Sequence, residues 1–411
     1  MSKLKHTAIY IPANVNKDLF IEEIFNGDLH ESFKELPALK GEVFSNAALN
    51  QFIDEEFRHE HFEIVTETNK SLHSMSNGEQ KKALLSYLIA KKPGFLILDN
   101  IIDNLDHEAQ VSILLTLQSI TESTIIIQLF NRKGDLLPFI KDVYFVEGTQ
   151  LVFGQQDDKL HTELVSDIPT TYTTYALEKT TLVKFNKVSV SYDDRPILKD
   201  ICWEIKSGEF WQLIGPNGSG KSTLLSMITG DNPKGYGQNL MLFGRKKGSG
   251  ESVWEIKDKI GYFNPTMTQQ FSRESTIEQM IISGFFDSIG LYFRPSEMQI
   301  KIAQEWLLLI GLYKERDKPF RSFSLGRQRM ILIARAMVKH PPLLILDEPT
   351  SGLDDENAGL CTALINKIAA EKTTAIVYVS HRKEAGLSPE FIFELISGEN
   401  GSTGIYMTKF N

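Results

Sequence analysis

The stretch GPNGSGKS, residues 215–222, decides the fold of this 411-residue chain. It matches the pattern GxxxxGK[ST], in which glycines let the backbone curl so that several N–H groups point at phosphate oxygens. The preceding GEFWQLI, residues 208–214, predicts a strand, and KSTLLSMITG, residues 221–230, predicts a helix whose N-terminus adds a positive dipole end. A chance glycine-rich loop is the alternative, and the flanking strand and helix argue against it.

The side chains of this loop have distinct expected roles. Lys221 reaches the β- and γ-phosphates of a nucleotide, and the Ser222 hydroxyl ligates Mg²⁺. The residues of this loop that we expect to bind ATP are Gly215, Asn217, Gly218, Ser219, Gly220, Lys221, Ser222 and Thr223.

A second motif, LLILDE at residues 343–348, is an apolar run that ends on two carboxylates. Ligands of α/β sheets bind at the carboxyl ends of strands, so we expect Asp347 to hold Mg²⁺ and Glu348 to polarise the attacking water as a general base. A solvated strand end is the simpler alternative for an Asp-Glu pair. The wholly apolar strand and the position 126 residues after Lys221 favour the catalytic interpretation.

Much of the second motif occurs twice. PGFLILDNIIDNLD at residues 93–106 aligns with PPLLILDEPTSGLD at residues 341–354, at an offset of 248. The same offset maps SMSNGEQKKALLSYLIAKKP (74–93) onto SFSLGRQRMILIARAMVKHP (322–341). A helix and strand repeated at one fixed spacing indicate an internal repeat. Short apolar strands alternating with helical patterns predict an α/β fold with a mostly parallel sheet.

Composition narrows the possible partners. The net charge of −9 argues against a general nucleic-acid binder held by phosphate contacts. Two cysteines, Cys202 and Cys361, are too few for a zinc cluster or a disulfide framework.

No apolar run approaches the ~20 residues of a membrane span, and the first residues lack a secretion signal. We therefore expect a cytoplasmic protein, with a peripheral position at the inner face of the membrane as the alternative.

In their order along the chain, these motifs resemble those of the ATP-binding cassette (ABC) ATPases. FSLGRQR at residues 323–329 stands in place of the family's signature motif, and SGLD at 351–354 follows the two carboxylates. The resemblance implies that Tyr192, in VSVSYDDRPIL, stacks on adenine and that His381, in VYVSHRKE, contacts the γ-phosphate. An aromatic at the edge of the core and an ordinary strand-end histidine are the simpler alternatives.

A closer resemblance is to the tandem-cassette proteins known as molybdenum transport ATP-binding proteins or photorepair proteins. It is specific over residues 183–385 and looser over 1–150. It implies an α/β fold of two tandem P-loop NTPase domains of the ABC nucleotide-binding type, the first truncated and degenerate. We expect the first domain at residues 1–154, a threonine-rich linker at 155–182 and the intact domain at 183–411. The segments that carry this resemblance are YDDRPILKDICWEI (192–205), GDNPKGY (230–236), LFGRKKGSGESVWEIKDKIGY (242–262) and ISGFFDSIGLY (282–292).

The sequence departs from the family pattern at two places. The family's loop glutamine after IGY is missing, and Pro265 stands there instead. Gln269 and Gln270 lie nearby, without a sequence reason to assign them the role. The second signature carries Leu325 and Arg327 where glycine and glutamine are usual.

The resemblance also implies how a complete site is assembled. Family cassettes pair head to tail, so that the phosphate loop of one faces the signature helix of the other. We therefore expect an intramolecular pair in which Ser76, Asn77 and Gly78 of the first half complete the site formed by the second half. A signature serine at a helix N-terminus suits an anion.

The mirror site is expected to be defective. Its phosphate loop falls at IPANVNKD, residues 11–18, where Lys17 survives but the glycines are gone and Asp18 replaces the Mg²⁺-binding hydroxyl. A carboxylate at that position repels phosphate, and a surface lysine is the simplest interpretation of Lys17. Asn100 cannot act as a base, and Asn131 stands roughly where a switch histidine belongs.

The sequence leaves the cellular process open. As an ATP hydrolase, the chain could be the ATP-binding component of a molybdenum-type ABC transporter, partnered by a membrane permease. Pro265 in place of the loop glutamine, and the fusion of two halves of unequal length, argue against a role in transport. The alternative is a soluble, non-transport ABC ATPase that acts as an ATP-gated clamp or a regulatory or repair factor. The long charged arm of ribosome-acting cassettes and the zinc modules or coiled coils of chromosome ATPases are missing. A solvated turn is the preferred interpretation of the basic cluster Arg245, Lys246 and Lys247.

Overall fold

The chain forms two compact units in the computed structural model, residues 1–160 with 352–355 and residues 161–351 with 356–411. Most of the predicted linker, and Ala13 and Asn14 of the first-half loop, lie outside the described residues. The first strand of unit 2, β7, begins at Thr181. The structure describes residues 5–12, 15–59, 63–64, 71–103, 105–147, 150–154, 164, 166–170, 175, 180–272, 274–381 and 384–408.

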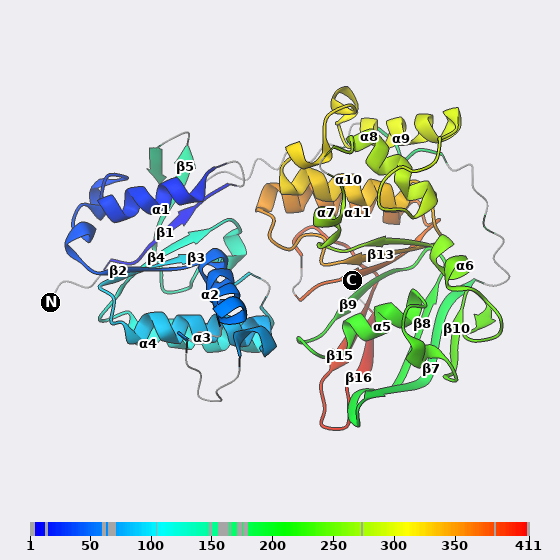
Figure 1. The fold of residues 1–411 in the computed structure, drawn as a ribbon, viewed down its shortest axis with the longest axis horizontal. Coiled ribbons are helices and arrows are strands. Elements are labelled where there is room, and N and C mark those ends of the chain that lie inside the picture. Colours follow the sequence, from blue (N-terminus) through cyan, green and yellow to red (C-terminus); the bar gives the residue numbers. More distant parts are fainter. Residues whose placement is uncertain are drawn as a thin grey trace. The chain divides into compact units, whose positions relative to one another are not determined.

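Unit 1 is built on a six-stranded sheet in the order β2-β3-β4-β1-β5-β6 (Figure 1). The first five strands in this order run parallel, and β6 is antiparallel to β5. The strands are β1 (Thr7–Tyr10), β2 (Gly41–Phe44), β3 (Phe95–Asp99), β4 (Ile125–Phe130), β5 (Asp142–Glu147) and β6 (Gln150–Phe153), and the α-helices are α1 (Lys17–Asn26), α2 (Asn46–His59), α3 (Asn77–Ala90) and α4 (His107–Ile120).

Both faces of this sheet are buried, which explains why β3 reads FLILD without a polar residue before its end. Side chains that alternate along a strand point to opposite faces. Ile97 packs in a cluster with Phe20 and Ile24 of α1. Leu96 packs in the cluster that contains Leu84 of α3 and the apolar face of α4. The sheet is therefore a middle layer between helices, as a parallel sheet requires.

Unit 2 contains a six-stranded sheet in the order β12-β13-β14-β9-β15-β16 and a four-stranded antiparallel sheet in the order β11-β10-β7-β8 (Figure 1). The strands are β7 (Thr181–Tyr192), β8 (Arg195–Lys206), β9 (Phe210–Ile214), β10 (Leu240–Leu242), β11 (Arg245–Lys246), β12 (Ile260–Phe263), β13 (Leu343–Asp347), β14 (Ala375–Val379), β15 (Phe391–Ile396) and β16 (Thr403–Thr408). The α-helices are α5 (Lys221–Ile228), α6 (Val253–Asp258), α7 (Met267–Gln270), α8 (Ile277–Ile282), α9 (Glu297–Leu309), α10 (Leu325–Met337) and α11 (Asp355–Ala370).

The two sheets of unit 2 share one apolar core with α5. Trp203 of β8 stacks on Phe393 of β15, with ring centroids 4.6 Å apart. Leu224 and Leu225 of α5 join the same cluster. This packing fixes the start of α5, and with it the phosphate loop, against the carboxyl end of β9.

The main sheets confirm the predicted repeat, because the strands of unit 1 match those of unit 2 position by position in the two sheet orders. Backbone details repeat as well. Asn100 and Glu348, 248 residues apart, both have positive φ values, of 46° and 48°. Asp99 pairs with Leu129 and Asp347 with Val379, which makes Asn131 the counterpart of His381. The α/β fold with two tandem cassettes is therefore confirmed.

The halves differ in what surrounds this sheet. From the end of β2 at Phe44 to Ser76 the chain has 32 residues, whereas from the end of β12 at Phe263 to Ser324 it has 61. Unit 2 uses the longer stretch for α7, α8 and α9. Within the described residues, unit 1 has one sheet and nothing that matches the antiparallel sheet. The first cassette is truncated around an intact central layer.

Candidate functional site

The phosphate loop begins where β9 ends and closes where α5 begins. Gly220 is the N-cap of α5 with φ 95°, a left-handed conformation that favours glycine. A Cβ atom at this position would lie 2.6 Å from a methyl carbon of Leu198, so a larger residue would force the Leu198 side chain of β8 to move. Both the backbone angle and the limited space therefore favour glycine at position 220.

Lys221 is the first residue of α5, and its side chain folds back across the loop. Its Nζ donates hydrogen bonds to the carbonyl oxygens of Gly215 and Pro216, at 2.7 and 2.9 Å. The same atom lies 3.5 Å from Nδ1 of His381. The ammonium group is therefore held over the loop, at the place where a phosphate anion would meet it.

Three polar side chains meet Lys221 at the carboxyl ends of neighbouring strands. Asp347 ends β13, Glu348 follows it, and His381 lies two residues beyond the end of β14. Nε2 of His381 contacts Oε1 of Glu348. Lys221, His381 and Glu348 thus form a chain of contacts along the edge of the sheet.

The two adjacent carboxylates have opposite pKa shifts. Burial and the neighbouring Glu348 carboxylate raise the pKa of Asp347 to about 6, against the opposing effect of Lys221 and His381. Burial alone would raise the pKa of Glu348, but the hydrogen bond and charge of His381, with Lys221 and Arg329, hold it below its ordinary value. Environments that shift the pKa values of two neighbouring carboxylates in opposite directions are typical of catalytic sites.

A cavity of about 400 Å³ collects most of the residues predicted from the sequence. Tyr192, on the β7–β8 hairpin, is one of the lining residues, and its hydroxyl accepts a 2.7 Å hydrogen bond from Nδ2 of Asn232. The Tyr192 residue is 39% exposed, which leaves it accessible to a ligand. Ser219 is not among the lining residues, and its side chain is buried. The cavity is lined by Tyr192, Ile197, Asn217, Gly218, Gly220, Lys221, Ser222, Thr223, Pro265, Asp347, Glu348 and His381.

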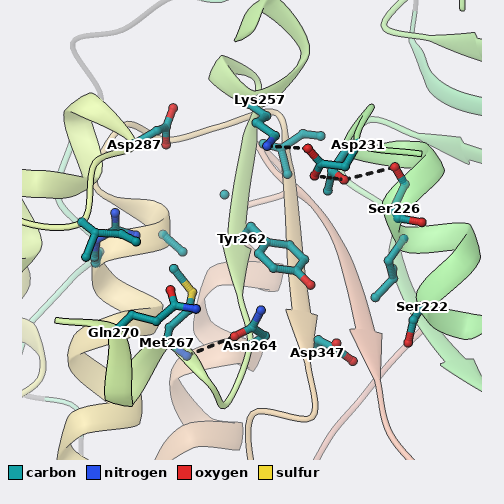
Figure 2. Close-up of a pocket in the computed structure, with 17 residues that line it drawn as sticks. Ser222, Ser226, Asp231, Lys257, Tyr262, Asn264, Met267, Gln270, Asp287 and Asp347 are labelled. Atoms are coloured by element: carbon teal, nitrogen blue, oxygen red, sulfur yellow. Dashed lines mark hydrogen bonds and ion pairs between the residues drawn. The ribbon is translucent and has the colours of Figure 1, made fainter. Parts of the chain in front are cut away.

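A second cavity, of about 440 Å³, shares Ser222 and Asp347 with the first (Figure 2). Tyr262 of β12 lies in its centre and turns its hydroxyl toward the side on which Ser222 and Asp347 lie. Gln270 lines this second cavity and not the first. Oδ1 of Asn264 accepts a 3.1 Å hydrogen bond from the backbone N of Met267 at the start of α7. Pro265, which lines the first cavity, thus begins a turn that Asn264 holds in place.

The counterpart of the phosphate site in unit 1 contains an ion pair. Lys17 is the first residue of α1, as Lys221 is of α5. Its Nζ lies 2.7 Å from Oδ1 of Asp99, the strand-end aspartate, with both side chains about three-quarters buried. The interpretation of Lys17 as an ordinary surface lysine is therefore wrong. The cation and the carboxylate that phosphate and Mg²⁺ would need are bound to each other.

The predicted signature residues of the first half lie at the N-terminus of α3. Ser76 is the N-cap and forms a capping box with Glu79, whose Oε2 accepts 2.7 and 2.8 Å hydrogen bonds from the serine Oγ and N. Ser76 and Asn77 are exposed, and Gly78 is buried against Ala109 of α4. Ser324, the N-cap of α10 in unit 2, makes no such side-chain bond.

Three residues that contribute to the site were not predicted from the sequence motifs. Asn232 donates a hydrogen bond to the Tyr192 hydroxyl, Tyr262 turns its hydroxyl toward the side of the second cavity on which Ser222 and Asp347 lie, and Arg329 binds the backbone of Glu348. Only Arg329 left a usable signal, since it matches the cation Lys81 at the repeat offset. Lys247 of the basic cluster is buried beside Glu251, 3.6 Å away, which excludes it as a nucleic-acid contact.

Comparison with known proteins agrees with this geometry. Residues 198–351 match the family model described as ABC transporter. The chain is 38% identical over 342 residues to the ABC transporter ATP-binding protein ModF of Escherichia coli K12, which covers 79% of this chain and 70% of that protein. It is 34% identical over 204 residues to the zinc uptake system ATP-binding protein ZurA of Listeria innocua, covering 49% of this chain and 76% of that protein.

Solved structures match 98% of the chain. The archaeal ribosome recycling factor aABCE1, in complex with the ribosomal stalk protein aP1, superimposes with a TM-score of 0.64 over 98% of this chain and 86% of that one. The identity is 15%, so this likeness shows the fold alone. In the described part of the chain, no helix has both the length and the apolar character needed to cross a membrane.

Proposed function

This chain belongs to the ATP-binding cassette ATPases, a family of ATP hydrolases, and we propose that it binds ATP with Mg²⁺ and hydrolyses it at one composite site per polypeptide. The observation that carries the proposal is the contrast between the halves. In unit 2 the loop lysine, the carboxylates and His381 line one cavity. In unit 1 the equivalent lysine and aspartate neutralise each other.

The oxygen ligands at the site suit Mg²⁺. A serine hydroxyl and a carboxylate are hard donors, and Mg²⁺ is usually held by one or two protein oxygens together with substrate phosphates. Ser222 and Asp347 would hold the ion, which when bound neutralises charge on the phosphates. Among the described residues no group of three or more His, Cys, Asp or Glu side chains that could hold a metal ion occurs.

The chain's own groups divide the work of hydrolysis. Tyr192 stacks on the adenine, and the loop N–H groups and Lys221 bind the phosphates. Glu348 accepts a proton from the attacking water. The oxygen of that water forms a bond to the γ-phosphorus, and the bond between the γ-phosphorus and the leaving oxygen of ADP breaks. His381, already in contact with Glu348, orients the carboxylate and faces the γ-phosphate.

One site per chain follows if the signature of the first half covers the nucleotide. Ser76 and Asn77 are exposed at the N-terminus of a helix of 14 residues, where N–H groups and the dipole favour an anion. Binding would require the Ser76 hydroxyl to leave Glu79 for a phosphate oxygen. The reciprocal signature at Ser324 would face the neutralised loop of unit 1.

The catalytic part is tested with Glu348→Gln, which we expect to bind ATP normally and to lose turnover by at least about 100-fold. Hydrolysis at the parental rate would remove Glu348 from its role. Equilibrium dialysis with ATP tests the stoichiometry: one site per chain is expected, and two equivalent sites would contradict the proposal.

A matched pair of substitutions tests the composite site. Ser76→Arg places a bulky side chain where the γ-phosphate is expected and should abolish turnover, whereas Ser324→Arg, at the equivalent position in the other half, should preserve it. Equal effects of the two substitutions would refute the asymmetric pairing. Thermal melting of both variants controls for folding.

We further propose that this ATPase is the ATP-binding component of an ABC transporter and works with a membrane permease. The names of its relatives, including a zinc uptake system, support this role, and the molybdenum association rests on resemblance alone. Pro265 in place of the loop glutamine favours a second candidate, a soluble ATP-gated clamp with regulatory or repair function. Affinity purification from membrane and soluble fractions separates them: a co-purifying permease supports transport, and tight binding with slow turnover and no membrane partner supports the clamp.

A further inference from the structure

One buried cation occurs at the same place in both halves of the chain. Arg329 is the fifth residue of α10 and is 4% exposed, and Lys81 is the fifth residue of α3 and is 1% exposed. The two positions are 248 residues apart, the offset of the repeat. A buried cation is costly unless polar groups surround it, so the groups that it meets are informative.

Both cations donate to backbone carbonyls of the loop that follows the strand-end aspartate. Nη1 of Arg329 lies 3.2 Å from the carbonyl oxygen of Glu348 and 3.4 Å from that of Pro349, and Nη2 lies 3.2 Å from that of Ser351. The three acceptors therefore span the turn from the general base to the start of the SGLD segment.

Lys81 reaches the equivalent atoms in unit 1. Its Nζ lies 3.5 Å from the carbonyl oxygen of Asn100, 3.2 Å from that of Ile101 and 2.7 Å from that of Asp103. Each acceptor is 248 residues before its counterpart in unit 2. Two side chains of different shape thus make the same three contacts, so the contacts follow from the architecture and not from the shape of one side chain.

The loop after β13 needs these hydrogen bonds because one of its residues has an unfavourable backbone conformation. Glu348 has φ 48°, in the left-handed region that asparagine tolerates and glutamate rarely adopts. Asn100, at the equivalent position, has φ 46°. Residues in this region persist only where their surroundings hold them, and at an active site the strain serves geometry. The carbonyl of Glu348 is itself one of the groups that Arg329 binds.

We propose that Arg329 is a positioning residue for hydrolysis: by binding three carbonyls it holds Glu348 in the left-handed conformation that places its carboxylate beside His381. This inference rests on the proposed role of Glu348 as the base. It also links the signature helix α10 to the general base through one side chain. Lys81 keeps the same loop in shape in unit 1, where no base is present.

The test compares two substitutions at each position, with turnover and affinity for a fluorescent ATP analogue measured separately. Arg329→Met should lower kcat about 10- to 100-fold, the effect of releasing one strained residue, and change nucleotide affinity less than about threefold. Arg329→Lys should keep kcat within about fivefold, because lysine reaches the same carbonyls in unit 1. Lys81→Met, the matched control, should lower the melting temperature without a comparable loss of kcat.

Parental kcat in Arg329→Met, or equal loss of kcat in Arg329→Met and Arg329→Lys, would overturn the inference. Should the methionine variant not fold, Arg329→Gln replaces it, and parental kcat in that variant has the same meaning. Failure here is distinguishable from failure of the proposed function, because Glu348→Gln would then be inactive while Arg329→Met hydrolyses ATP normally.

Discussion

Replacing Asp347 by asparagine should stabilise the protein in the absence of metal and nucleotide. Burial and Glu348 raise the pKa of Asp347 from 3.8 to about 6, so the ionised carboxylate is destabilising in the folded state. Between pH 4 and 6 the folded state binds more protons than the unfolded state, and stability contributed by this group falls as pH rises through that window. A shift of this size means that Asp347 lowers the free energy of unfolding by about 3 kcal/mol at pH 7 and by about 1 kcal/mol at pH 4.5, relative to a neutral side chain.

Urea unfolding in the presence of a chelator measures this difference. All four tryptophans, at residues 203, 211, 254 and 306, lie in unit 2, so their fluorescence reports the unit that contains Asp347. We expect Asp347→Asn to exceed the parent in unfolding free energy at pH 7 and the gap to shrink toward pH 4.5. A gap that does not change with pH, or a variant less stable than the parent at pH 7, would refute the reasoning. Mg²⁺ with ATP should stabilise the parent and not the variant.

Three other predictions follow from contacts in the two units. Lys17→Met should lower the stability of unit 1 by about 1 kcal/mol, as expected for a partly exposed ion pair, and leave ATP binding unchanged, whereas Lys221→Met should abolish binding. Tyr192→Ala should weaken ATP binding about fivefold by loss of stacking, and Tyr192→Phe, which loses only the hydrogen bond from Asn232, should bind within about twofold of the parent; fluorescence titration checks both. Lys247→Met should destabilise unit 2 by about 3 kcal/mol, because it leaves a carboxylate without its buried partner, as chemical unfolding would show.

The fold was predictable because its signals are local. The phosphate loop with its flanking strand and helix, and the repeat of FLILD and LLILD at a fixed offset, require a parallel sheet in each half. The site of the truncation was not predictable in the same way. The stretch from Lys17 to Ser76 is 44 residues shorter than the stretch from Lys221 to Ser324, but this difference in length does not say where along the stretch the residues are missing. Only the position of β2 shows that part of it precedes that strand.

At the site, motif residues were predictable and their partners were not. The cavity brings Lys221, Glu348 and His381 together, as the order of motifs indicated. The hydrogen bond from Asn232 to Tyr192 and the ion pair of Lys17 depend on how distant segments pack, which no single-sequence pattern encodes. Lys17 is the clearest case. In a loop without glycines the sequence indicates an ordinary surface lysine, and only the structure shows that its Nζ lies 2.7 Å from Oδ1 of Asp99.

The two halves together separate what the architecture needs from what the chemistry needs. Unit 1 retains the sheet order, the left-handed residue after the strand-end aspartate and the buried cation that holds its loop. It lacks the glycines of the loop, the glutamate after the strand-end aspartate and the histidine, which are the residues that we propose to contact the nucleotide. If the retained features served only ATP hydrolysis, they would have no function in unit 1, where Lys17 and Asp99 already neutralise each other. Their presence there indicates that they maintain the shape of the strand-end loop in both halves of the chain, independently of ATP hydrolysis.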